Sequence, residues 1–160
     1  MAIPSDTNYF RLFSIIQKNI MKALGREPNH FHDEFADVVA YRTWLIFKLD
    51  VLLFEYREEN DSQRLVLSGR RALDSYLFTK HGIPLHVSRS YSLDDVIILM
   101  FNEIYSHTLS DSVFSKLITQ SEYQLSDRNF FNLDKQYREF CEAEWDPELA
   151  DRTLLKGLVV

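Results

Sequence analysis

One long stretch, Asp33–Tyr56, constrains the fold of this chain more than any other part of the sequence. Apolar side chains recur in it at spacings of three, four and seven residues, which is the pattern of a helix face. Further apolar side chains widen this stripe past half a cylinder, and a helix that is apolar on most sides is a buried one. We therefore expect a long buried helix over residues 33–56, about 36 Å long at a rise of about 1.5 Å per residue.

Three charged residues argue against a membrane span in the same stretch. Arg42, Lys48 and Asp50 interrupt it, and the uncharged runs are far shorter than the ~20 residues that a spanning helix needs. The aromatic and β-branched residues in the stretch would also suit a strand, but neither Gly nor Pro interrupts it and no turn pair follows it. A buried helix of a protein outside the membrane is therefore the favoured interpretation.

The rest of the chain also predicts helices. The sequence has only four Gly and four Pro, which argues against a turn-rich β fold. Helical stripes or caps indicate further helices at about residues 7–24, 63–81, 93–107, 113–118, 130–141 and 147–157. In the helix at 93–107 the expected inner stripe is Val96, Ile97, Met100, Phe101, Ile104 and Tyr105. Ser92 and Asp95 are expected to form a near capping box at its start, and Ser5 or Asp6 to cap the helix at 7–24. Residues 85–91 alternate in polarity and are the one segment expected to be extended. We predict a single all-α domain over residues 1–160, a compact bundle of about six or seven helices around the central helix.

Cysteine content and the N-terminal sequence bear on the cellular compartment. The single cysteine, Cys141, excludes an internal disulfide. The N-terminal residues MAIPSDTNYF lack a basic region followed by an apolar core, so no secretory signal is predicted. We expect a cytoplasmic protein.

Acidic charge gives the strongest indication of a binding surface. The net charge is −6, and the longest basic run is the pair Arg70–Arg71, so we expect no direct binding to nucleic acid. Six acids and no base lie between Glu139 and Asp151, with aromatic residues interleaved. Such a patch suits a basic partner, because charges steer the encounter and an aromatic side chain anchors it. The predicted partner-binding residues are Tyr137, Glu139, Glu142, Glu144, Trp145, Asp146 and Glu148. The alternative is a solvated helix face whose aromatic side chains point inward.

A metal site is the competing candidate. His30, His32, Asp33 and Glu34 offer imidazole and carboxylate ligands beside a helix start, and Glu103 with His107 could add two more. The alternative is that the histidines are ordinary loop residues and the acids favour the helix dipole. We expect no cofactor.

Catalytic motifs give little support to an enzyme. Cys141 lies among acids, which should raise the pKa of its thiol. The sequence contains neither a G-x-S-x-G turn nor a glycine-rich phosphate loop.

Three functions are therefore in competition. The favoured one is a non-catalytic inhibitor of the immunity-protein or antitoxin type that docks on a basic protein such as a nuclease toxin. The alternative is a metal-dependent enzyme or metal-binding protein that uses the 30–34 segment. The third is a subunit of a larger assembly that buries the apolar tail Leu158–Val160 at an interface.

Overall fold

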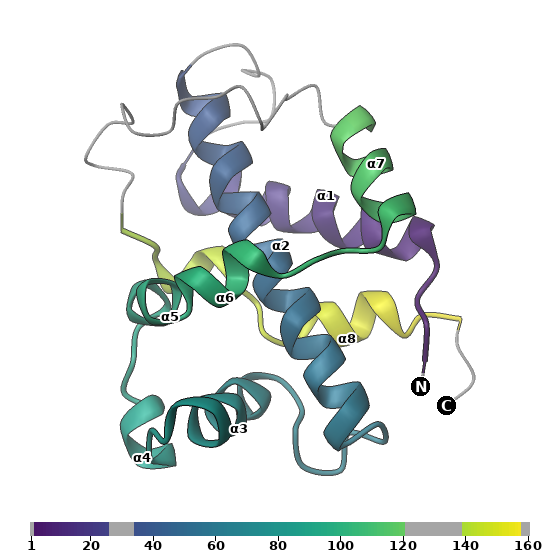
Figure 1. Cartoon of the computed structure of the whole chain (residues 1–160). Coiled ribbons are helices and arrows are strands. Elements are labelled where there is room, and N and C mark those ends of the chain that lie inside the picture. The colour runs from purple at the N-terminus through teal and green to yellow at the C-terminus, as the bar shows by residue number, and fades with distance from the viewer. Residues whose placement is uncertain (1, 26–33, 121–138, 158–160) are drawn as a thin grey trace.

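The structure, a computed structural model, describes residues 2–25, 34–120 and 139–157. In these residues the chain forms eight α-helices and one short 3-10 helix, and no strand (Figure 1). The elements are α1 (Asp6–Ala23), α2 (Glu34–Asn60), α3 (Arg70–His81), α4 (Leu85–Ser88), α5 (Leu93–Leu99), α6 (Phe101–Ser106), α7 (Asp111–Gln120), η4 (Glu142–Glu144) and α8 (Leu149–Leu154). The predicted all-α bundle is confirmed.

Helix α2 is the central element, as the sequence predicted. It runs without a break from Glu34 to Asn60 and packs against α1, α3, α6 and α8. Figure 1 shows α1 and α7 towards one end of α2, and α3 and α4 towards the other. The helix continues past the expected end at Tyr56, because Arg57 and Glu58 are themselves buried in its last turn. None of the helices in the described residues is long and apolar enough to cross a membrane.

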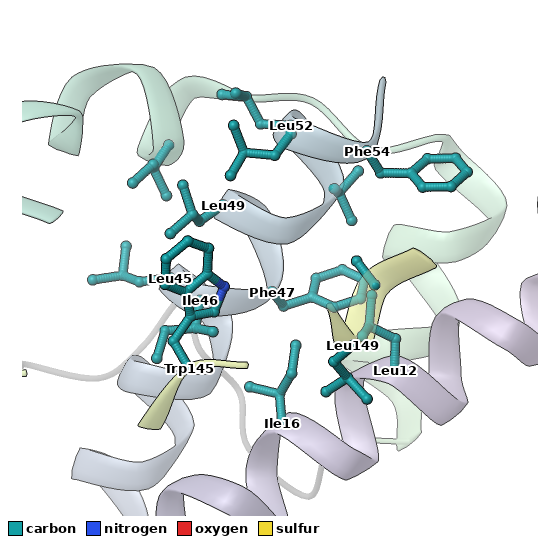
Figure 2. Packing of buried hydrophobic residues seen from close by; sticks show 14 of the residues in the cluster. Leu12, Ile16, Leu45, Ile46, Phe47, Leu49, Leu52, Phe54, Trp145 and Leu149 are labelled. Carbon is teal, nitrogen blue, oxygen red and sulfur yellow. The ribbon is translucent and has the colours of Figure 1, made fainter. Parts of the chain in front are cut away.

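The core forms where α1, α2 and the C-terminal segment meet. Leu12 and Ile16 of α1 face the middle of α2, and Trp145 and Leu149 close the same cluster from the C-terminal side (Figure 2). Phe47 of α2 is fully buried, and its ring meets the Phe13 ring edge-on at 5.4 Å between centroids. Truncating a buried aromatic ring of this kind to alanine typically costs about 3–5 kcal/mol.

The charged residues inside α2 are bonded to other elements. Lys48 Nζ donates to the Tyr105 carbonyl oxygen at 2.7 Å. Arg57 Nε lies 3.2 Å from Asp151 Oδ1 on α8. Because a buried charge is costly unless it is paired and hydrogen-bonded, these contacts fix which neighbours α2 can accept. The central helix thus supplies both apolar side chains to the core and buried polar contacts to other elements.

A structured loop replaces the first part of the helix expected at 63–81. Helix α3 begins only at Arg70, and the residues before it wrap around the Asp61 carboxylate. That carboxylate accepts hydrogen bonds from the backbone N–H groups of residues 65, 66 and 67, at 2.7–3.0 Å. Such Asx-type bonds compete with helix formation. Arg64 has φ +57°, which no helix residue adopts, and Gly69 has φ +58°.

Three further predictions need correction. The helix expected at 130–141 does not include residues 139–141, and its other residues lie outside the described part of the chain. Residues 85–91 are not extended, since Pro84 starts the short helix α4 and its carbonyl accepts from Val87 and Ser88. The helix expected at 93–107 is divided at Met100 into α5 and α6.

The inner stripe expected on that helix is correct for four of its six residues. Val96, Ile97, Met100 and Ile104 are buried, whereas Phe101 and Tyr105 are 38% and 65% exposed. The bend at Met100 ends one helix and starts the next, so the sequence stripe does not continue straight across it.

Candidate protein-binding surface

The acidic segment near the C-terminus is anchored to the bundle through Glu144. Its carboxylate forms a buried ion pair with Arg42 of α2, with Arg42 Nε 2.5 Å from Glu144 Oε1 and Arg42 Nη2 2.9 Å from Glu144 Oε2. Arg42 also donates to the Glu139 carbonyl and lies over the Phe140 ring, 4.2 Å from its centroid. Glu144 is 1% exposed, so its charge is directed into the protein and not towards a partner.

Trp145 also points inward. It is 6% exposed, and its indole N–H donates to Asp50 Oδ1 at 2.8 Å. Burial raises the pKa of the Asp50 carboxyl to about 7, although the Trp145 hydrogen bond and the charge of Arg57 act in the opposite direction. The side chain expected to anchor a partner is therefore part of the core (Figure 2).

Glu139 and Glu142 are exposed and lie beside the start of α5. Two hydrogen bonds join the 139–142 segment to the start of α5, and each segment donates one of them. Leu93 N–H donates to Glu142 Oε1 at 2.6 Å, and Phe140 N–H donates to Asp94 Oδ1 at 2.9 Å. Residues more than 40 positions apart in the sequence thus share one surface.

The helix start at α5 adds two more acids to this surface. Ser92 and Asp95 form the capping box that the sequence predicted, with Ser92 Oγ accepting from Asp95 N–H and Asp95 Oδ2 accepting from Ser92 N–H, both at 3.1 Å. Asp95 is exposed and Asp94 is half-buried. Among the described residues, no basic side chain pairs with any of the four carboxylates that we call the α5 acidic surface: Asp94, Asp95, Glu139 and Glu142.

The remaining predicted partner-binding residues lie elsewhere or outside the described residues. Asp146 Oδ2 lies 2.5 Å from Arg152 Nη2 in an exposed ion pair, so its charge is locally balanced. Glu148 is exposed, and its carboxylate lies against Gly69. Tyr137 falls outside the described residues. The structure therefore brings together only Glu139 and Glu142 of the predicted set, and it adds Asp94 and Asp95.

The candidate metal ligands do not meet in the described part of the chain. His30, His32 and Asp33 lie outside it, and Glu34 begins α2 with a side chain that is not described. No group of three or more His, Cys, Asp or Glu residues that could hold a metal ion occurs among residues 2–25, 34–120 and 139–157.

Glu103 and His107, the two further metal ligands considered from the sequence, contact different residues. The Glu103 carboxylate accepts from Tyr76 and pairs with His81, whereas His107 Nε2 lies 2.9 Å from Glu55 Oε2. The two side chains therefore serve separate contacts between helices.

Cys141 has the environment of an unreactive thiol. Desolvation and the neighbouring Glu144 carboxylate raise the pKa of the thiol, as its acidic sequence context predicted. A raised pKa keeps the sulfur protonated near neutral pH, which is the opposite of an activated nucleophile.

Sequence reasoning missed Asp94 as a surface acid, and it assigned Asp95 only to the helix cap. The signal was present in the two adjacent acids, but their meeting with Glu139 and Glu142 depends on the fold. Comparison of this chain with protein-family models, curated proteins and solved structures found no match.

Proposed function

We propose that this protein is a non-catalytic binding module that docks on a basic protein partner through the α5 acidic surface. The observation that carries the proposal is the pair of hydrogen bonds between the 139–142 segment and the start of α5. They bring the Asp94 and Glu142 carboxylates of two distant segments to one surface, next to the exposed residues Asp95 and Glu139. Carboxylates on one surface attract an incoming basic group, and this supports the proposal.

An inhibitor of the immunity-protein or antitoxin type is the partner-binding function that these properties favour. A nuclease carries a basic cleft for the phosphate backbone, and an acidic protein surface can occupy such a cleft in place of phosphate. The net charge of −6 acts in the same direction, because it attracts a basic protein over long range.

Two of the predicted partner-binding residues, Glu144 and Trp145, are buried and are therefore unsuitable for a test of docking. Glu144 and Trp145 hold Arg42 and Asp50, respectively. A change at either position disturbs the fold and would weaken any interaction indirectly. A docking test therefore uses only exposed carboxylates, and it replaces them with amides that keep a hydrogen-bond acceptor.

The experiment is affinity capture on the immobilised protein from a lysate of the native host, at about 50 mM and about 500 mM salt, with mass spectrometry of the retained proteins. We expect a basic protein to be retained at low salt and released at high salt. The variant D95N/E139Q/E142Q should lose most of this retention. Glu142→Gln keeps Oε1 as the acceptor for Leu93 N–H.

The matched control is D146N/E148Q, which removes the half-buried Asp146 and the exposed Glu148 of the same C-terminal segment, both outside the α5 acidic surface. It should retain the partner as well as the original protein does. Equal retention by D95N/E139Q/E142Q would refute docking through the α5 acidic surface. A column that is clean at both salt concentrations would count against a tight basic partner.

A further inference from the structure

An exposed apolar stripe continues along α5 and α6 from the α5 acidic surface. Ile98 is 69% exposed, Leu99 39%, Phe101 38% and Tyr105 65%. These are four of the nine large apolar side chains that are exposed in the described residues, and they fall within eight consecutive positions. Scattered exposed apolar residues need no explanation, but a contiguous group of this size marks an interaction site.

The exposed apolar side chains lie on both sides of the bend at Met100. Ile98 and Leu99 end α5, and Phe101 and Tyr105 lie four residues apart on α6. The rings of Phe101 and Tyr105 stack, with centroids 5.7 Å apart and planes 23° apart.

Contacts with α2 and α3 hold α6 in place. Lys48 Nζ of α2 donates to the Tyr105 carbonyl oxygen, and the Glu103 carboxylate is bonded to Tyr76 and His81 of α3. Buried Val96, Ile97 and Ile104 fix the inner face. An apolar surface that is ordered before binding loses little conformational entropy when a partner docks.

We propose that the outward face of α5 and α6, carrying Ile98, Phe101 and Tyr105, is the docking site for a basic amphipathic helix of the partner protein. This inference rests on the proposed function, because it takes the partner to be basic. An amphipathic helix presents apolar anchors at i, i+3/i+4 and i+7 along one face, so it can place several of them on a short apolar surface such as this one.

Charge complementarity determines the chemistry of that helix. Asp94 and Asp95 lie one turn before Ile98 and Leu99, and Glu142 and the backbone of Phe140 are hydrogen-bonded to the same end of α5. The partner helix should therefore carry Lys or Arg at the end that lies over these acids, and Leu, Ile, Met or aromatic residues along the stripe. A second copy of this chain is a poorer match, because it would bring like charges together.

The test uses a synthetic helical peptide of about 16 residues with Leu at the i, i+3, i+4 and i+7 positions and Lys elsewhere. Binding to the full chain is followed by fluorescence anisotropy of a label on the peptide. We expect I98S/Y105S to weaken binding by about tenfold or more, since apolar anchors carry most of such binding energies. A peptide of the same composition without the apolar face, and one with Glu in place of Lys, should bind at least about tenfold more weakly than the first peptide.

The matched control is L65S/V66S, which removes two equally exposed apolar side chains from the loop after α2. It should bind the peptide like the original protein. Equal loss in both variants, or equal binding of the peptide without the apolar face, would mean that the peptide adheres to any apolar surface and would overturn the proposal. A dimer seen by analytical ultracentrifugation and abolished by I98S/Y105S would overturn it as well, in favour of a second copy.

A final comparison separates this inference from the proposed function. If a basic protein captured from the host lysate is lost by D95N/E139Q/E142Q but kept by I98S/Y105S, the proposed function stands and the α5–α6 docking site fails. If both variants lose the partner, both proposals are supported. If no variant and no salt condition retains a basic protein, the proposed function fails, and the docking site fails with it.

Discussion

Arg42 of α2 and Glu144 of the C-terminal segment form an ion pair that is buried on both sides, with side chains 2% and 0% exposed. The pair joins positions 102 residues apart in the sequence. It also explains why the most acidic stretch of the chain is not wholly a surface feature. One carboxylate of that stretch compensates the charge of an arginine that α2 carries into the core.

Breaking this pair from one side should be costly. Glu144→Gln leaves the Arg42 guanidinium buried without a counter-charge, which typically costs about 3–5 kcal/mol of stability. Urea unfolding followed by circular dichroism measures the loss. The exposed variant Glu142→Gln is the control and should change stability by less than about 0.5 kcal/mol.

The double variant R42M/E144Q tests the cause of the loss. With no charge left to compensate, it should be more stable than E144Q alone. A double variant that is less stable than E144Q would show that the guanidinium contributes through its contacts with Glu139 and Phe140 and not through an uncompensated charge.

Asp50 should make the stability fall as pH rises. Its folded-state pKa is raised by burial to about 7 from an ordinary value of 3.8, so between these values the folded protein holds a proton that the unfolded chain has released. Stability should therefore decline by up to about 1.4 kcal/mol per pH unit from about pH 4 to pH 7, and level off above that.

The variant Asp50→Asn isolates this effect. It keeps the acceptor for the Trp145 indole N–H and cannot ionise. Its stability relative to the original protein should rise between about pH 4 and about pH 7, as measured by chemical denaturation at each pH. A difference that is independent of pH would contradict ionisation of a buried Asp50.

Several elements could be predicted from the sequence because their signals are local. The cap at Ser5, the apolar stripe of α1 and the long apolar run of α2 depend on residues within one or two turns of each other. The capping box of Ser92 and Asp95 is also local, and the structure confirms it. These elements are fixed before any tertiary contact is specified.

The orientation of the acidic segment could not be predicted in the same way. Glu144 and Glu142 are two residues apart and chemically identical, yet one is buried and the other is exposed. Only the positions of Arg42 and Leu93 in the fold distinguish them. Arg42 and Asp50 did carry a usable signal, because a charged residue inside a buried helix requires a partner.

The loop before α3 should depend on the Asp61 carboxylate. Asp61→Asn has one acceptor oxygen in place of two and no negative charge, so it can accept at most two of the three backbone hydrogen bonds and accepts them more weakly. Hydrogen exchange at Val66 and Leu67 should become faster, while exchange at Leu77 in the middle of α3 should be unchanged. Equal acceleration at all three amides would mean that the substitution destabilises the whole fold.

The same loop should respond to acid. Backbone N–H groups of residues 67, 66 and 65 hold the pKa of the Asp61 carboxyl below its ordinary value. The contribution of the carboxylate is therefore complete above the ordinary pKa of an aspartate and is lost as pH falls through the lower, folded-state value. Exchange protection at Val66 should disappear with decreasing pH in the original protein and show no such step in Asp61→Asn.

Gly69 should tolerate a side chain less well than Gly82, although both have positive φ. Gly82 closes α3 with φ 69° and ψ 19°, a left-handed conformation that costs alanine about 1–2 kcal/mol. Gly69 has φ 58° and ψ −136°, a region that is nearly restricted to glycine, and a Cβ there would overlap the Glu148 carboxylate. G69A should therefore lose more stability than G82A in urea unfolding.

The variant G69A/E148A separates backbone strain from this overlap. The Glu148 carboxylate ends an exposed, flexible side chain that can move away, whereas the backbone of residue 69 is held by the Arg57 hydrogen bond to its carbonyl. Removing Glu148 should then recover only a small part of the loss, less than about 1 kcal/mol. Full recovery would assign the requirement for glycine at position 69 to the contact with Glu148 and not to its backbone conformation.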